Sequence, residues 1–289
     1  MNEFGKVYIP LQILSIDVVL GALLTGNMGA MLLQIDMPWA WWIVFPISIW
    51  IFYTGDHLLD AYRLGEKAHT LRHRFHYKYF TPLFILVCLF LILVGICSFS
   101  APKSLWQLGF ILGCLGCIHL GLSYLLKDRV SKWIQKELGV AIIYTVGVWG
   151  GPAVLYSPIL PWAFYVIVCQ FLFLALINLL LFSIYEMETD TLDGHTSFVR
   201  AIGRSNAKKW VGGLLLGLVI LSIGLLSNGY PGIDWIYSQT IVLIIGGIFL
   251  FILLFPQWFG EKDRYRVWGD GAFLVSALFP LATYLAEGF

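Results

Sequence analysis

Charged residues are scarce in this sequence. Only 12% of the 289 residues are Asp, Glu, Lys or Arg, whereas 59% are hydrophobic. A soluble domain of this length needs more polar surface, so the composition indicates an integral membrane protein. The net charge is +1. Because membrane topology determines where the charged residues lie, this value gives no evidence for nucleic-acid binding, and we expect no nucleic-acid partner.

The sequence also lacks the motifs of several common enzyme classes. It has no GxxxxGK[ST] loop, which argues against a nucleoside triphosphatase, and no GxSxG nucleophile elbow. Its histidines follow no HExxH pattern, so a zinc site is not indicated. The five cysteines lie in apolar segments, and the CxxC of Cys114 and Cys117 has no second pair of ligands nearby. We interpret them as small residues that pack between helices.

Nine apolar segments are long enough to cross a bilayer, which takes about 20 helical residues. They lie at 8–33, 40–59, 80–99, 104–126, 137–156, 161–186, 208–227, 235–255 and 267–286. The sequence therefore predicts one all-α transmembrane domain over residues 1–289, with nine helices around a central cavity.

The basic residues alternate between the connections of these segments. The N-terminal residues and every second connection together hold 17 of the 18 Lys and Arg residues, and the other set, including the C-terminus, holds only Lys103. Loops rich in Lys and Arg stay in the cytoplasm. With nine spans, we expect the N-terminus in the cytoplasm and the C-terminus outside.

Two acidic stretches stand at the cytoplasmic ends of the second and sixth segments. The first, YTGDHLLDAYR, carries Asp56 and Asp60, and the second, FSIYEMETDTLDG, carries Glu186 and Asp190. In each pair the carboxylates stand four residues apart, which stacks them on one helix face, where like charges repel. Something cationic should therefore compensate them.

Magnesium is the cation that this pattern favours. It binds through one or two carboxylates plus substrate phosphates. A single acidic pair at a helix end would be explained by solvation, but two pairs on one membrane face, each followed by a basic loop, favour a functional site. Nearby basic residues such as Arg72, Arg74 and Arg200 satisfy the positive-inside rule, and some are candidates to bind phosphate oxygens.

Asn178 stands two turns before Glu186 on roughly the same helix face. Two interpretations are open for its side chain. It either points into the cavity, where it contacts substrate, or makes a hydrogen bond between helices.

Nine helices with acidic motifs after the second and sixth resemble the UbiA superfamily of intramembrane prenyltransferases. The segment EMETDTLDGHTSFVRAIG is similar to the family's DxxxDxxxG motif and the residues that follow it, with Glu186 and Asp190 in the two Asp positions. The segment YLLKDR, with Tyr124, Lys127 and Arg129, is similar to the family's Tyr-x-x-Lys-Arg segment.

The resemblance implies an activity and a set of site residues. Members of this superfamily bind an isoprenyl diphosphate through magnesium and ionise it. By resemblance, the catalytic and magnesium-binding residues are Asp56, Asp60, Glu186 and Asp190. The substrate-binding candidates are Arg72, Arg74, Tyr124, Lys127, Arg129, Asn178 and Arg200.

The first motif departs from the family pattern NDxxDxxxD. Aligned on spacing, Asp56 replaces Asn, His57 replaces the next Asp, Asp60 is kept and Leu64 replaces the last Asp. His57 is either a lost ligand or a recruited base. We favour the lost ligand, because adjacent helical residues point about 100° apart and His57 therefore points away from Asp56.

The expected function is transfer of an isoprenyl group from a magnesium-bound isoprenyl diphosphate to an aromatic or lipid acceptor. One alternative is a cyclase of the same superfamily. Another is a non-enzymatic protein that binds an ion or a lipid on the same scaffold, with Asp17 and Asn27 among its ligands. Transporters tend to place charge near the bilayer midplane. The carboxylates here gather at one face, which favours the enzyme, although Asp17 fits either interpretation.

The expected topology is testable by cysteine labelling. Cysteines at positions 103 and 132 should react with an impermeant reagent from opposite sides of the membrane, because the two connections differ in basic charge. Labelling of both from the same side would contradict the predicted topology.

Overall fold

The structure is a computed structural model that describes residues 10–65, 70–125, 136–192, 197–228 and 232–287. Every regular element in these ranges is helical. The longer helices are α2 (Ile16–Leu32), α3 (Trp39–Leu64), α5 (Phe80–Ser98), α6 (Lys103–Leu125), α7 (Lys136–Leu155), α8 (Trp162–Leu192), α10 (Arg204–Ser227) and α11 (Ile233–Leu254). The shorter elements are α4 (Leu71–Lys78), α9 (Phe198–Ile202), α12 (Pro256–Gly260), η2 (Glu261–Asp263), α13 (Arg264–Gly271), η3 (Ala272–Ala277) and α14 (Leu278–Glu287).

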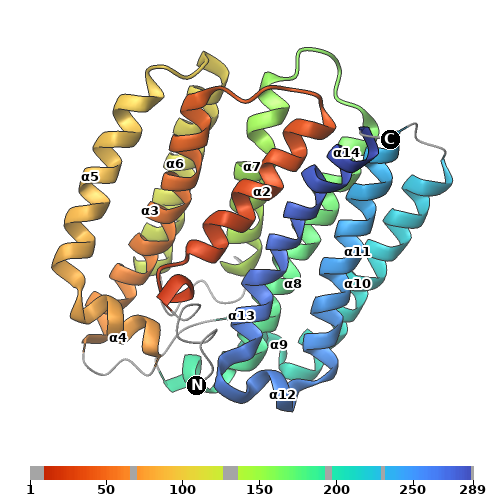
Figure 1. Ribbon diagram of the computed structural model, residues 1–289. Coiled ribbons are helices and arrows are strands. Elements are labelled where there is room, and N and C mark those ends of the chain that lie inside the picture. Colours follow the sequence, from red (N-terminus) through yellow and green to blue (C-terminus); the bar gives the residue numbers. More distant parts are fainter. Residues whose placement is uncertain (1–9, 66–69, 126–135, 193–196, 229–231, 288–289) are drawn as a thin grey trace.

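Seven of the described helices are long and apolar enough to cross a membrane: α3, α5, α6, α7, α8, α10 and α11. They confirm a multi-pass membrane protein. In Figure 1 the long helices form one bundle, and α4, α9 and α12 lie together at one end of it. This end carries both acidic stretches, so it is the end that we expect to face the cytoplasm.

The first and last expected spans differ from continuous helices. The span expected at 8–33 contains a break at Ser15, whose φ of 56° lies in the left-handed region, and only the 17 residues of α2 follow it. The span expected at 267–286 is divided into α13, η3 and α14. The described residues therefore show seven long apolar helices and the shorter apolar helix α2, so the expected count of nine spanning helices is not confirmed.

Two short helices at this same end of the bundle begin at side-chain caps. The Thr70 hydroxyl accepts a hydrogen bond from the His73 amide and starts α4. The Ser197 hydroxyl does the same for the Arg200 amide at the start of α9. Such caps satisfy amides that the first helical turn leaves without partners, so local sequence fixes where α4 and α9 begin.

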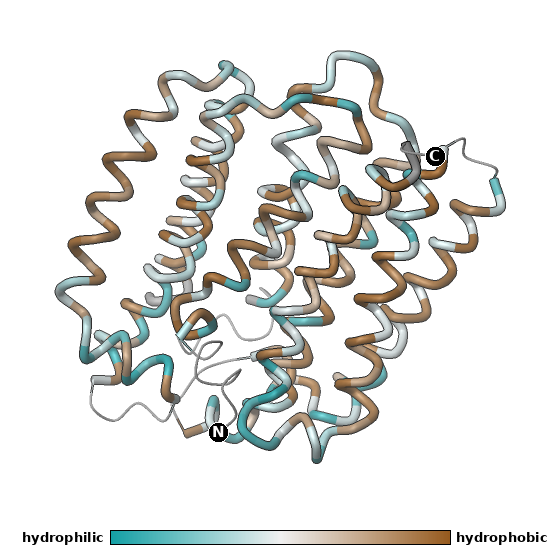
Figure 2. The backbone as a smooth tube through the Cα atoms, in the orientation of Figure 1, coloured by the Kyte–Doolittle hydropathy of each residue, from teal (hydrophilic) through white to brown (hydrophobic). Residues whose placement is uncertain are grey.

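The centre of the bundle is α8. In its apolar stretch 56% of the residues are buried, against 11% in α5 and 6% in α6. Trp149 of α7 packs its ring on Phe164 and Phe171 of α8. Figure 2 shows a predominantly hydrophobic α5 at the rim of the bundle, as expected for a helix that faces lipid.

Three polar side chains join α8, α10 and α11 within the apolar core. Gln170 donates from Nε2 to Ser222 Oγ at 2.9 Å and to Gln239 Oε1 at 2.8 Å. Gln239 donates in return to Gln170 Oε1 at 3.1 Å. All three side chains are buried. Hydrogen bonds of this kind hold helices together where no water is present.

The substitution Gln170→Leu should destabilise the bundle by about 1–3 kcal/mol, because it leaves Gln239 and Ser222 without their partner. Thermal unfolding in detergent measures the loss. The control Thr240→Ala removes an exposed hydroxyl that bonds within its own helix and should change stability by less than about 0.5 kcal/mol. Equal stability of the two variants would contradict a structural role for Gln170.

Candidate functional site

Ionisable side chains from five helices meet at the end of the bundle that carries both acidic stretches. They interact electrostatically with one another across α2, α3, α4, α8 and α13. We call the following residues the polar cluster: Asp17, Tyr53, His57, Arg72, His76, Glu186, Tyr265, Arg266 and Asp270. Ionisable residues at the ends of membrane helices mark functional sites.

The first acidic pair is partly compensated by the protein itself. Asp60 lies 4.0 Å from Arg63 Nη1, one turn along α3, and 3.7 Å from His73 Nε2 of α4. Asp56 lies one turn before Asp60, as predicted, and is partly buried. The basic side chains beside Asp60 are thus Arg63 of its own helix and His73 of α4.

His57 holds Arg72 at the junction of α3 and α4. His57 Nε2 lies 3.1 Å from Arg72 Nη1, and Arg72 Nη2 donates to the Gln12 carbonyl at 3.4 Å. A guanidinium has no acceptor, so His57 Nε2 must be the acceptor and its ring is neutral with the proton on Nδ1. The lone pair that a recruited base would use is thus occupied by Arg72.

The second acidic stretch is held by α13. Glu186 forms an ion pair with Arg266 and accepts a hydrogen bond from the Tyr265 hydroxyl at 2.8 Å. Tyr265 stacks on Tyr185 with ring centroids 4.4 Å apart. Asp190, one turn after Glu186, is partly buried near the end of α8. Sequence reasoning missed the partners of Glu186, which lie about 80 residues away along the chain.

Asn178 also faces α13. Its Nδ2 donates to Asp270 Oδ1 at 3.1 Å, and both side chains are 7% exposed. A Cβ at Gly269 would lie 2.5 Å from Asn178 Oδ1 and 2.6 Å from the Phe182 ring, so only glycine allows this approach of the two helices. Of the two interpretations of Asn178, the structure thus shows the hydrogen bond between helices. Asp270 was not predicted, although a carboxylate in an apolar span is itself a signal.

The electrostatics of α4, which is too short to span the membrane, follow from burial. Burial lowers the pKa of Arg72, and the charge of Arg266 lowers it further, while nearby carboxylates oppose the shift. Burial also lowers the pKa of His76, against the effect of its hydrogen bond to the Arg72 carbonyl. At neutral pH His76 is therefore neutral and Arg72 keeps its charge.

The remaining predicted site residues lie at the periphery or outside the described ranges. Arg74 of α4 and Arg200 of α9 are exposed. Lys127, Arg129 and the side chain of Tyr124 lie outside the described residues.

Glu137, at the start of α7, positions the segment that follows the second acidic stretch. Its Oε1 accepts from Ser183 Oγ at 3.1 Å and from the Phe198 amide at 2.8 Å. The carboxylate is 7% exposed. It thereby ties the start of α9 to α8 beside the polar cluster.

The described side chains were compared with the needs of a magnesium ion. No group of three or more His, Cys, Asp or Glu among them is arranged to hold a metal. Glu186 is already engaged by Arg266 and Tyr265, and Asp60 lies against two basic side chains. The described side chains alone therefore form no three-ligand metal site, and Glu186 and Asp60 already have partners within the protein. A metal-binding role stays a prediction for Asp56, Asp60, Glu186 and Asp190.

Comparison with solved structures decides the fold. A UbiA homologue from Archaeoglobus fulgidus bound to GPP and Mg²⁺ is similar with a TM-score of 0.70 and 16% identity, over 96% of this chain and 99% of that one. An apo UbiA homologue from Aeropyrum pernix K1 is similar with a TM-score of 0.67 and 12% identity, over 92% and 98%. The protein has the UbiA fold.

Other comparisons do not extend this result. No family model matches the sequence, and no curated protein matches it. A second form of the A. fulgidus homologue, bound to DMAPP and Mg²⁺, has a TM-score of 0.64 and 15% identity, over 93% of this chain and 98% of that one. At these identities the likeness establishes the UbiA fold, which confirms the fold class predicted from the two acidic stretches.

The ion pair between Glu186 and Arg266 should be needed for stability. Arg266→Gln leaves a mostly buried carboxylate without its cation and should cost about 3–5 kcal/mol, measured by thermal unfolding in detergent. The double variant Glu186→Gln, Arg266→Gln should recover part of this loss. Arg264→Gln is the control, because its ion pair with Glu261 is more exposed. Equal stability of the two single variants would contradict the role of the Arg266 pair.

Proposed function

We propose that this protein is an intramembrane prenyltransferase that moves an isoprenyl group from an isoprenyl diphosphate to an aromatic or lipid acceptor. The observation that carries the proposal is the environment of Arg72. Within the described part of the chain, its guanidinium donates to two neutral acceptors, His57 and the Gln12 carbonyl, and forms no ion pair. An anionic substrate would supply the missing counter-charge.

A diphosphate is the anion that suits this guanidinium. Arg binds phosphate oxygens through two parallel hydrogen bonds, and a partly desolvated guanidinium gains more from such bonds than an exposed one. Arg266 belongs to the same cluster, where its charge is balanced by the ion pair with Glu186. The UbiA homologue from A. fulgidus was solved with GPP bound, which supports an allylic diphosphate as the donor here.

The chemistry follows from where charge develops. As the bond between the isoprenyl carbon and the diphosphate oxygen breaks, negative charge grows on the leaving group, where Arg72 would stabilise it. The positive charge grows on the isoprenyl carbon. Aromatic faces stabilise such a cation and exclude water. Tyr53 and Tyr144 interact electrostatically with each other, and Tyr144 contacts the Phe273 ring at 6.0 Å.

Asp56, Asp60, Glu186 and Asp190 are retained as the proposed catalytic carboxylates. The observed ion pairs place protein cations beside two of them. Whether binding depends on magnesium is therefore an outcome of the experiment.

A second candidate function is non-enzymatic binding of an anionic isoprenoid on the same scaffold. The compensation of Glu186 and Asp60 by protein cations favours it, because carboxylates that are already paired do not require a metal. Binding without turnover would distinguish this candidate from the enzyme.

Binding of geranyl diphosphate, measured by calorimetry with the purified protein, tests the site. Arg72→Gln should weaken binding by about tenfold or more, as expected for loss of a charge-assisted contact. The control is Lys78→Gln on the same helix, which removes an exposed charge and should leave affinity within about twofold. Equal affinities of the two variants would contradict the assignment.

Two further measurements in the same experiment test the metal and the reaction. If magnesium is required, EDTA should reduce binding, and Asp60→Asn and Asp190→Asn should reduce the magnesium-dependent part. Products formed with a panel of aromatic and lipid acceptors are identified by mass spectrometry. Prenylated acceptors support the transferase, cyclised hydrocarbons indicate a cyclase, and binding without product indicates the non-enzymatic candidate.

A further inference from the structure

Helix α2 packs in a regular register against the last apolar segment, which begins with α13 and η3 (Figure 1). A Cβ at Gly21 would lie 2.8 Å from the Phe273 Cβ, so the two backbones approach closely there. One turn further along both elements, the Thr25 and Ser276 hydroxyl oxygens lie 3.0 Å apart. These steps of four residues in α2 and three in η3 are one turn of each helix type, so facing positions repeat turn by turn.

The same register places two carboxylates opposite each other one turn earlier. Asp17 lies four residues before Gly21, and Asp270 lies three residues before Phe273. Their side chains are 2% and 7% exposed, and Asp17 acts electrostatically on Asp270. Arg72 interacts electrostatically with both, so the carboxylate pair stands beside the proposed anion site.

Asp270 has acceptor capacity that the described part of the chain leaves unused. Asn178 Nδ2 donates to its Oδ1 at 3.1 Å, which is its one hydrogen bond among the described residues. An ionised carboxylate offers about four acceptor positions. Asn178 Oδ1 is also buried without a hydrogen-bond partner in these residues. Buried acceptors are normally paired, so this end of the polar cluster lacks a donor group.

Two tyrosines from other helices surround the Asp270 carboxylate. Tyr53 of α3 and Tyr144 of α7 both interact electrostatically with it. The Tyr144 ring lies 6.0 Å from the ring of Phe273, one turn after Asp270. Both tyrosine side chains keep part of their surface exposed, so a ligand beside Asp270 would meet aromatic walls.

The charge of the carboxylate pair selects among ligands. A hydroxyl group donates to a carboxylate and brings no charge of its own. A ligand carboxylate or phosphate beside two buried carboxylates is repelled, and this repulsion is strongest where water is scarce. The pair therefore favours a different part of the reaction than Arg72, which suits an anion.

We propose that Asp17 and Asp270 form the acceptor subsite, and that the acceptor is a neutral compound that presents a hydroxyl group. A phenol or a lipid alcohol meets this requirement, whereas an aromatic carboxylate or a phosphorylated lipid does not. The inference rests on the proposed function and adds the chemical class of the acceptor.

The pair also receives the proton that the transfer releases. The hydroxyl oxygen of the acceptor bonds to the isoprenyl carbon. The bond from that carbon to the diphosphate breaks, and its electron pair stays on the diphosphate. The hydroxyl proton passes to the pair, because two facing carboxylates readily hold one proton between them. The products are an isoprenyl ether and diphosphate.

Matched acceptors test the selection by charge. Initial rates of ether formation from geranyl diphosphate are measured by mass spectrometry with 4-hydroxybenzamide against 4-hydroxybenzoate, and with monooleoylglycerol against its phosphate ester. The two members of each pair share a hydroxyl group and differ in charge. In at least one pair the neutral member should react about tenfold faster or more. The pair that reacts shows whether the acceptor is a phenol or a lipid alcohol.

Variants of the two carboxylates test their roles. Asp270→Asn keeps an oxygen that accepts from Asn178, and it should slow transfer to the neutral acceptor by about 100-fold, as expected for loss of a base. Its affinity for geranyl diphosphate, measured by calorimetry, should stay within about twofold, because Arg72 is unchanged. Asp17→Asn should reduce the preference for the neutral acceptor to about threefold, because less negative charge remains.

The matched control is Asp263→Asn, which changes an exposed carboxylate just before α13. The backbone there is left-handed, a conformation that Asn adopts readily. This variant should keep both the rate and the preference.

Equal rates with neutral and anionic acceptors, or full activity of Asp270→Asn, overturn the acceptor assignment and leave the proposed function standing. Donor binding with no ether from either neutral acceptor also overturns the acceptor assignment, while the donor site stands. The comparison of acceptors uses wild-type protein and does not depend on the folding of any variant. Wild-type protein that does not bind geranyl diphosphate overturns both the inference and the proposed function.

Discussion

The compensation of charge within an apolar bundle is the constraint on which this structure depends. A carboxylate inside a membrane protein is costly unless it is paired. Glu186 meets this requirement through Arg266 and Tyr265, so α13 must lie against the end of α8. Gly269 permits that approach because it has no side chain. The ion pair, the glycine and the Asn178–Asp270 hydrogen bond together fix how the last apolar segment closes the bundle.

In the first acidic stretch, the negative charge is reduced in a different way. Where the family pattern has a carboxylate, this chain has His57, and a guanidinium lies on the imidazole. A neutral imidazole adds no negative charge, so the requirement for an external cation is smaller here. The first motif has lost a carboxylate, and Asp60, which it retains, is paired inside the protein. Because Arg72 lies against the neutral His57, it is the central residue of the proposed anion site.

The sequence predicted the helices better than the site. Long apolar runs such as Phe80–Ser98 form spans because a helix satisfies their backbone hydrogen bonds internally, and Pro82 lies in the first turn, where proline is tolerated. The UbiA fold was predicted from these spans together with the positions of the acidic pairs. The partners of those pairs were not predictable. The sequence places Arg72 and Arg266 in connections between the expected spans, where the positive-inside rule already explains their charge. Only the tertiary structure shows that these two side chains lie within the polar cluster. The break at Ser15 had no local signal such as glycine or proline.

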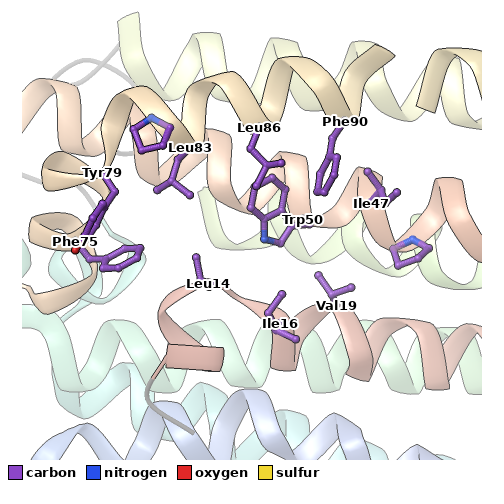
Figure 3. Close-up of a pocket in the computed structure, with 12 residues that line it drawn as sticks. Leu14, Ile16, Val19, Ile47, Trp50, Phe75, Tyr79, Leu83, Leu86 and Phe90 are labelled. Carbon is purple, nitrogen blue, oxygen red and sulfur yellow. The ribbon is translucent and has the colours of Figure 1, made fainter. Parts of the chain in front are cut away.

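The unequal burial of the helices has a consequence for access. α8 is anchored on several sides, whereas α5 packs along α3 and α4 and presents most of its surface outward. Together with α2 and α3, α5 lines an apolar groove (Figure 3) that lies away from the buried α8. A long amphiphile could then enter sideways from the bilayer, and its chain would never have to cross water.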